Sequence, residues 1–139
     1  MTPYKHLNKH SDRGRLMKDC DKLFFEILKI ERGSKCEVCG RPNPTPAHTL
    51  SKGVHPRLRY EKANVHLFCW LPCHYYWHHD REDNRAKKVE TYIIKKLGAN
   101  WHERLKILDK TMPRLTTDYL KLLKLAFTME LERLKKGKL

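Results

Sequence analysis

Apolar residues recur every three or four positions in four long stretches of the chain, a spacing that lines one face of an α-helix. These stretches cover about residues 12–30, 84–97, 100–110 and 116–136. Gly33, Gly98 and Pro113 follow three of them, as residues that end helices commonly do. The pattern therefore predicts a mostly helical protein.

The middle of the chain has a different pattern. Three prolines exclude a helix in its first part: Pro42, Pro44 and Pro46. Polar and apolar residues alternate over residues 64–69, which predicts a short strand, and a second strand begins or ends at His48. Pro72 suits the first turn of a helix that begins near Cys73.

Four of the five cysteines form two close pairs about thirty residues apart: Cys36 and Cys39, then Cys69 and Cys73. Two such pairs are typical of a structural zinc site with four thiolate ligands. The alternative, two disulfides, requires an oxidising compartment, which nothing else in the sequence indicates. The fifth cysteine, Cys20, lies on the apolar face of the first helix, where we expect it to be a small buried hydrophobic residue.

The charge of the chain indicates a polyanionic partner. Its 139 residues include 30 Lys and Arg against 16 Asp and Glu, a net charge of +14. Nucleic acid is the first candidate and an anionic membrane surface the second. No apolar run approaches the ~20 residues that span a bilayer, and no signal-peptide pattern opens the sequence. We therefore expect a soluble intracellular protein without a membrane partner.

Polar residues with catalytic potential surround the second cysteine pair: His48, Asn64, His74 and His78. Hydrolysis of a phosphodiester requires an activated water, a sink for negative charge and help for the leaving oxygen. A neutral imidazole is a suitable base for the water, and a divalent cation supplies the other two requirements. His74 and His78 are four residues apart, so a helix places both on one face. Each histidine taken alone is more simply a surface or core residue.

The order Cys-x2-Cys, His, Asn, Cys-x3-Cys-His-x3-His resembles the HNH nucleases. The resemblance implies an α+β fold with a small zinc-stapled, treble-clef-like ββα-metal core flanked by helices, mostly helical overall. It also implies roles for four residues: His48 is the general base, Asn64 orients it, His74 binds the catalytic metal, and His78 is an additional metal ligand.

A closer resemblance exists over residues 36–79. The run from His48 to Tyr60, and the Asn-Val-His that precedes the second cysteine pair, are similar to the NinG/Rap endonucleases of lambdoid phages. That family implies cleavage of branched recombination DNA, such as Holliday junctions, D-loops and flaps, in the cytoplasm of a bacterium that carries the phage or prophage. The implied cofactors are a structural Zn²⁺ and a catalytic divalent metal, Mg²⁺ or Mn²⁺.

The sequence departs from the HNH pattern at one position that matters. Many HNH nucleases have an acidic residue or a histidine directly before the base, as a metal ligand, and this chain has Ala47. The catalytic metal is therefore short of one ligand, and His55 is our candidate for the replacement. Phosphate contacts are expected from Lys52, Arg57 and Arg59, although this stretch is equally consistent with a solvated charged loop.

We expect one compact domain with three segments: an N-terminal helical segment 1–34, a zinc-stapled nuclease core 35–82 and a C-terminal helical region 83–139. The aromatic residues near the second cysteine pair, Trp70, Tyr75, Tyr76 and Trp77, are more typical of a core than of a base-stacking surface. The leading hypothesis is a structure-selective endonuclease that acts as a homodimer, because resolving a junction requires two cuts. The alternatives are an HNH enzyme that nicks or cuts duplex DNA at specific sites, and a non-catalytic zinc-finger protein that binds nucleic acid.

Overall fold

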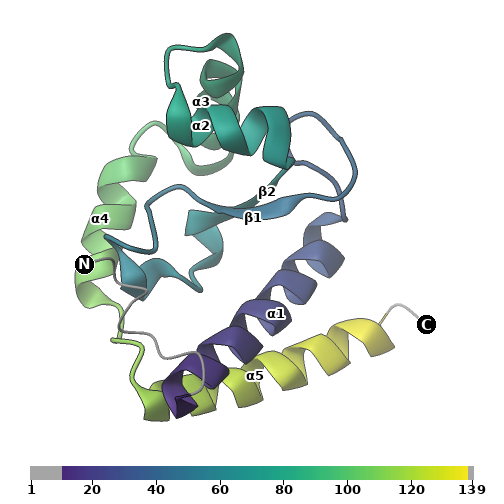
Figure 1. The fold of residues 1–139 in the computed structure, drawn as a ribbon, viewed down its shortest axis with the longest axis vertical. Helices are drawn as coiled ribbons and strands as arrows, with labels where there is room; N and C mark the ends of the chain where they lie inside the picture. The colour runs from purple at the N-terminus through teal and green to yellow at the C-terminus, as the bar shows by residue number, and fades with distance from the viewer. Residues whose placement is uncertain (1–10, 138–139) are drawn as a thin grey trace. The chain divides into compact units, whose positions relative to one another are not determined.

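The computed structural model describes residues 11–137, which are mostly helical and contain one two-stranded sheet (Figure 1). The helices are α1 (Asp12–Arg32), α2 (Tyr75–His79), α3 (Asn84–Leu97), α4 (Trp101–Thr111) and α5 (Thr117–Lys136). The strands are β1 (Thr45–His48) and β2 (Val65–Phe68). The four predicted long helices are therefore confirmed, with bounds that differ by one or two residues. None of the helices in the described range is long and apolar enough to cross a membrane.

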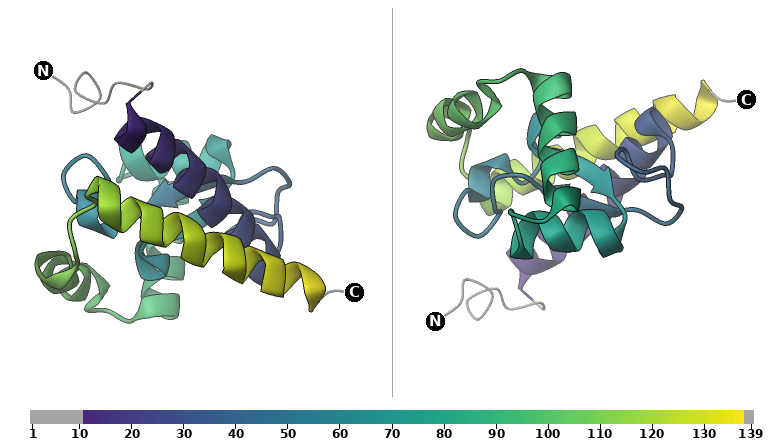
Figure 2. Two further views of the ribbon diagram at one scale, coloured as in Figure 1. Left: turned by 90° about the horizontal axis from the view of Figure 1, so that it is seen from below. Right: turned by 90° about the horizontal axis from the view of Figure 1, so that it is seen from above.

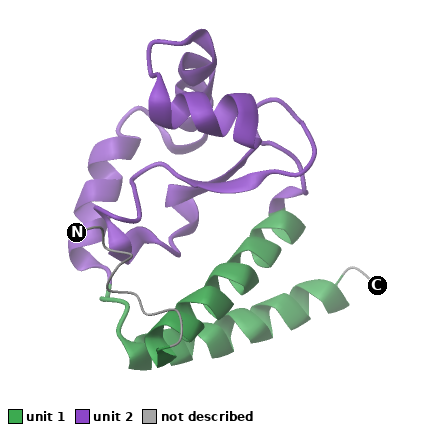
Figure 3. Ribbon diagram, in the orientation of Figure 1, with its two compact units in different colours: residues 1–31, 113–139 green, residues 32–112 purple. Residues whose placement is uncertain are grey.

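The chain forms two compact units, which Figure 3 shows in two colours. One contains α1 and α5, and the other, residues 32–112, contains the sheet and the remaining helices. This division differs from the three segments expected from the sequence. The reason is that α3 and α4 bury their apolar faces in the same core as the sheet, whereas α5 packs on α1.

Helices α1 and α5 lie side by side in their unit (Figure 2). The rings of Phe24 and Phe127 pack with centroids 5.5 Å apart. Cys20 is fully buried, and its Sγ donates a hydrogen bond to the carbonyl of Leu120 at 3.6 Å. The prediction that Cys20 is a buried residue of the helix face, separate from the cysteine pairs, is confirmed.

Strands β1 and β2 form an antiparallel hairpin. Its register pairs Thr45 with Phe68 at one end and His48 with Val65 at the other. The hairpin loop comprises residues 49–64, and a wide helical turn over residues 70–74 leads from β2 into α2. Both predicted strands are confirmed, with His48 as the last residue of β1.

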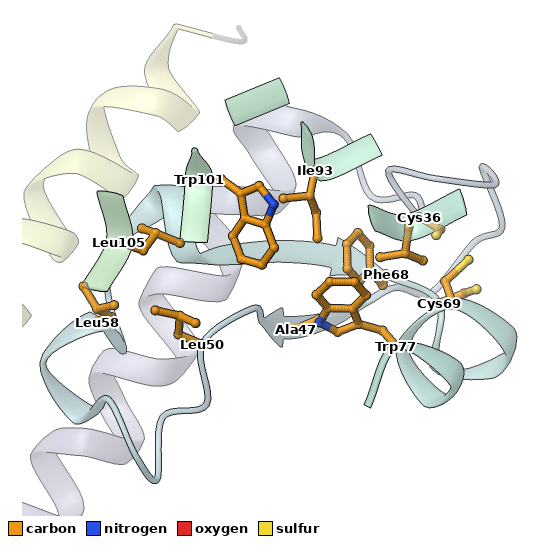
Figure 4. Packing of buried hydrophobic residues seen from close by; sticks show 12 residues of the cluster. Cys36, Ala47, Leu50, Leu58, Phe68, Cys69, Trp77, Ile93, Trp101 and Leu105 are labelled. Atoms are coloured by element: carbon orange, nitrogen blue, oxygen red, sulfur yellow. The ribbon is translucent and has the colours of Figure 1, made fainter. Parts of the chain in front are cut away.

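The core of the 32–112 unit joins the hairpin to the cysteine pairs (Figure 4). Ala47, Phe68 and Trp77 are completely buried at its centre, and Ile93 of α3 and Trp101 of α4 pack around them. Burial of each large side chain stabilises the fold by about 1.5–3 kcal/mol. The same cluster contains three of the paired cysteines, so the hairpin, α2 and the cysteines are held in one rigid arrangement.

Candidate functional site

The four paired cysteines form a metal-binding group. The Sγ atoms of Cys36, Cys39, Cys69 and Cys73 all lie within 4.8 Å of one another. Gly40, with φ of +77°, closes the turn that brings the first pair together, and its N–H donates to the carbonyl of Cys36 at 2.9 Å. Four sulfurs in so small a volume suit tetrahedral Zn²⁺. The group therefore fits the structural zinc predicted from the spacing.

The surroundings raise the pKa of two of these thiols and lower the pKa of a third. Burial raises the pKa of Cys69 and of Cys73. Burial also raises the pKa of Cys39, but hydrogen bonds from the backbone of Arg41 and from the neighbouring thiols outweigh it and bring that pKa to about 7. Thiolates are the ligands of zinc, so a bound cation releases protons from the buried members of the group.

Glu37, between the first two cysteines, connects the first cysteine pair to α3 and β2 through hydrogen bonds. Its carboxylate accepts hydrogen bonds from Tyr92 Oη at 2.5 Å and Lys96 Nζ at 2.7 Å, both on α3, and from the backbone N–H of Leu67 on β2. Burial raises the pKa of Glu37, but His66 and these three donors outweigh it and hold the pKa well below its usual range. The spacing of the cysteines gave no indication of this buried carboxylate.

The backbone determines which nitrogen of His48 carries the proton. Nε2 of His48 lies 3.0 Å from the carbonyl oxygen of Arg59. A carbonyl only accepts hydrogen bonds, so Nε2 is the protonated nitrogen in the neutral ring and Nδ1 carries the lone pair. The hairpin loop thus fixes the tautomer of the residue predicted to be the base.

Asn64 is fully buried and bonds to the hairpin loop with both ends of its amide. Its Oδ1 accepts from Thr49 Oγ1 and from the N–H of Leu50, each at 2.8 Å. Its Nδ2 donates to the carbonyls of Leu50 at 3.0 Å and Leu58 at 3.3 Å. The sequence interpretation gave Asn64 the task of orienting the imidazole of His48. These four bonds assign it to shaping the loop, whose Arg59 carbonyl contacts that imidazole.

His74 is held by a relay of hydrogen bonds. The hydroxyl of Thr45 donates its one proton to the carbonyl of Phe68 at 2.9 Å. It must therefore accept the hydrogen bond from Nδ1 of His74 at 2.7 Å, so Nδ1 is protonated and Nε2 of His74 carries the lone pair. Burial, followed by the nearby His78 and His48, lowers the pKa of His74 to about 4. The ring is therefore neutral near pH 7, as a metal ligand must be. Thr45 is a positioning residue that the sequence did not reveal.

The structure brings three of the predicted site histidines together. The rings of His74 and His78 are 4.9 Å apart, and His48 is close enough to lower the pKa of His74. Burial, then Arg81 and His79, also lowers the pKa of His78. Over residues 11–137, no third ligand joins His74 and His78 in a group as close as the cysteines.

The other predicted residues of the hairpin loop have partners of different kinds. Nδ1 of His55 bonds to Asp109 of α4 at 2.9 Å, and Arg57 donates to the carbonyls of Lys110 and Met112 at 3.4 Å. These contacts fasten the loop to the end of α4. The positive charge of Lys52 makes the smallest of the contributions that lower the pKa of His74. Metal binding by His55 and phosphate contacts by Arg57 remain predictions.

The aromatic residues near the second cysteine pair divide into two groups. Trp77 is completely buried, as expected of a core residue. Trp70 and Tyr75 are 54% and 38% exposed, so the prediction of a core position is wrong for both. The helical turn after Cys69 directs Trp70 away from the core, and periodicity alone cannot foresee such a turn.

Comparison with known proteins gives one match. The family model described as "Bacteriophage Lambda NinG protein" matches residues 4–137, which is nearly the whole chain. None of the curated proteins and none of the solved structures compared with the chain matched it.

Proposed function

The chain belongs to the NinG family, and from this premise we propose that it is a metal-dependent, structure-selective DNA endonuclease of the HNH type. Its substrates are branched recombination intermediates: Holliday junctions, D-loops and flaps. One observation carries the proposal. His48 at the end of β1 and His74 after β2 lie near each other, and backbone and hydroxyl oxygens fix the tautomer of each.

His48 is the general base in this proposal. Its Nε2–H is bound to the carbonyl of Arg59, so Nδ1 accepts the proton of the attacking water. When the water loses its proton, the imidazole becomes positive, and the Arg59 carbonyl stabilises that charge. Asn64 acts indirectly, because its bonds to Leu50 and Leu58 hold the loop that carries Arg59.

His74 and His78 are the proposed ligands of the catalytic metal. A divalent ion bound there supplies a sink for the charge of the phosphorane and help for the leaving oxygen. Nε2 of His74 carries a lone pair, and its ring stays neutral at pH 7, so the donor set fits. Two imidazoles suit Mn²⁺ better than Mg²⁺, which prefers oxygen ligands, and they leave coordination positions for water and phosphate oxygens.

The distribution of charge supports a DNA substrate. Residues 36–80 contain five Lys and Arg against three Asp and Glu, so most of the net charge of +14 belongs to the regions before and after them. The positive charges of Lys52 and Arg81 act on His74 and His78 respectively, and we infer that they attract a phosphate to these histidines. We infer that the helical regions provide most of the affinity for DNA and that the hairpin provides the chemistry.

Resolution of a junction requires two cuts, so we propose that the chain acts as a homodimer through α5. Leu122, Leu125 and Met129 are each at least 60% exposed and lie on one face of this helix. Two antiparallel copies of α5, related by a twofold axis between residues 125 and 126, set Leu122 against Met129. The same register sets Asp118 against Arg133, so the charges are complementary as well.

Substrate preference tests the proposed function. Labelled four-way junction, flap and linear duplex of the same sequence are incubated at equal salt with Mg²⁺ or Mn²⁺. We expect incision of the junction and the flap, with 5′-phosphate ends, and little incision of the duplex. Equal cleavage of all three would favour the alternative of a nicking or site-specific HNH enzyme. Binding without cleavage in every metal would favour a non-catalytic zinc protein.

A further inference from the structure

Of the three tryptophans, one lies at the surface. Trp77 and Trp101 are 0% and 8% exposed and belong to the core, whereas Trp70 is 54% exposed. Leu71, next in the sequence, is 58% exposed, and Tyr75, whose ring packs on Trp70, is 38% exposed. Large apolar side chains gathered at a surface commonly mark a site of interaction.

Trp70 adjoins the proposed catalytic metal site. The rings of Trp70 and His74 pack in a T-shaped arrangement, with centroids 5.2 Å apart and planes at 73°. The rings of Trp70 and Tyr75 pack in the same way with centroids 6.2 Å apart, and Tyr75 packs on His79 with centroids 4.6 Å apart. Trp70 and Leu71 lie between Cys69 and Cys73, so the cysteine group fixes the chain on both sides of them.

We propose that Trp70, supported by Leu71 and Tyr75, is a stacking surface for an unpaired or unstacked base beside the phosphate that is cut. This inference rests on the proposed function and names the feature of the substrate that the enzyme selects. Every base has a π-face, so stacking on an indole selects a conformation of the strand without selecting a sequence.

The position of Trp70 explains how stacking would select branched DNA. Inside a linear duplex each base is already stacked on both sides, and its extrusion costs a few kcal/mol. At the branch point of a junction or flap, the terminal pairs lack a neighbour on one side, so this cost is smaller. Because Trp70 contacts His74, a base held on its ring belongs to a nucleotide next to the phosphate at that histidine.

The first test measures DNA affinity in EDTA at a concentration that leaves the cysteine-bound metal in place, verified by zinc content. Base–aromatic stacking contributes ~1–3 kcal/mol, so we expect Trp70→Ala to bind the four-way junction about 5- to 150-fold more weakly. Trp70→Phe should recover part of the loss, and affinity for linear duplex should change less than about 2-fold. Ile107→Ala removes a side chain that is 63% exposed on α4 and is the matched control, which should bind as the wild type does.

The second test uses the native protein. Because Trp77 and Trp101 are buried, acrylamide should quench mainly the fluorescence of Trp70. Saturating junction should protect this fluorescence from quenching, and saturating linear duplex should protect it less. Equal protection by both DNAs, or none by the junction, would contradict a surface specific for unstacked bases.

The two proposals can fail separately. Unchanged junction affinity in Trp70→Ala, or an equal loss for junction and duplex, overturns the stacking surface even if the wild type cuts junctions. A wild type that binds junctions but cuts no DNA overturns the proposed nuclease, and the affinity of Trp70→Ala still decides the role of Trp70. A wild type that binds no DNA overturns both.

Discussion

Two imidazoles of the proposed site, His48 and His74, each have their tautomer fixed by a hydrogen bond to an oxygen of the surrounding structure. The carbonyl of Arg59 assigns the proton of His48 to Nε2, and Thr45 assigns that of His74 to Nδ1. Two chemically identical side chains thereby present different nitrogens, Nδ1 in one and Nε2 in the other. The groups that set this difference are the carbonyl of Arg59 and the hydroxyl of Thr45. Neither takes a direct part in the proposed reaction.

The bonds of Asn64 lead to a prediction for stability. Asn64→Ala removes four buried hydrogen bonds and takes the partner away from the backbone N–H and carbonyl of Leu50, so the free energy of unfolding should fall by about 2 kcal/mol or more. Urea denaturation measures this change. Asn100→Ala is the control, because Asn100 is exposed and its side chain makes no capping bond, and it should change stability by less than about 0.5 kcal/mol. A change in Asn64→Ala as small as in the control would refute the positioning role.

His66 leads to a prediction for pH dependence. It is fully buried, and neither ring nitrogen has a hydrogen-bond partner in the described structure. Its Nδ1 lies 4.0 Å from the carboxylate of Glu37, which raises the pKa of His66, but burial outweighs this and lowers that pKa. As pH falls below about 6.5, the unfolded chain binds a proton at His66 that the folded chain does not, so acid favours unfolding. Between pH 7 and pH 5 the wild type should therefore lose more stability than His66→Phe. Chemical denaturation at both pH values measures this, and equal losses would contradict it.

At the scale of the elements, the hairpin, α2 and the cysteine group share one core, so none of them is expected to be stable alone. The periodicity of the sequence was sufficient to predict the long helices, because each has a complete apolar face and a clear stop. The sequence also predicted that His48 lies at one end of a strand, and the structure shows that it is the last residue of β1. The roles of Thr45, Glu37 and Asp109 did not, because their partners are distant in sequence and depend on how the elements pack.

Removal of the metal tests whether the hairpin and α2 depend on the cysteine group for their stability. A chelator that strips the cysteine group should unfold the hairpin and α2, because three of the cysteines belong to the core. Cys73→Ser should have the same effect and should abolish the content of one zinc per chain. Cys20→Ser is the matched control, because Cys20 lies in the other unit. Zinc content by mass spectrometry and structure by circular dichroism measure the outcome. An unchanged fold after complete removal would contradict a structural role.

For the whole molecule, we propose that charge provides affinity for DNA and that shape provides selectivity for branched DNA. The net charge of +14 implies that DNA binding releases counterions and weakens steeply with salt. Phosphate contacts carry no information about branching, so selectivity must come from exposed features such as Trp70 and from the pairing of two copies. The exposed face of α5 is the surface that we assign to this pairing.

A charge exchange tests the register of the α5 pair. Leu125→Glu should convert the dimer into a monomer, whereas Ile107→Glu, at an exposed site on α4, should not. Asp118→Arg and Arg133→Asp should each weaken the dimer, and the two changes together should restore it, because opposite charges again face each other. Sedimentation equilibrium measures the dissociation constant. A wild type that stays monomeric at tens of micromolar would refute this interface.

We propose that His48 is the general base of a metal-dependent nuclease. The most direct test of this role is the single-turnover rate of four-way junction cleavage in Mn²⁺ and Mg²⁺ by wild type, His48→Ala and His102→Ala, with junction affinity measured in parallel. We expect metal-dependent cleavage that His48→Ala reduces about 10²- to 10⁴-fold without loss of affinity. His102→Ala, at an exposed position on α4, should cleave at the wild-type rate. Cleavage by His48→Ala at the wild-type rate, or junction binding by the wild type without cleavage in either metal, would contradict the proposal.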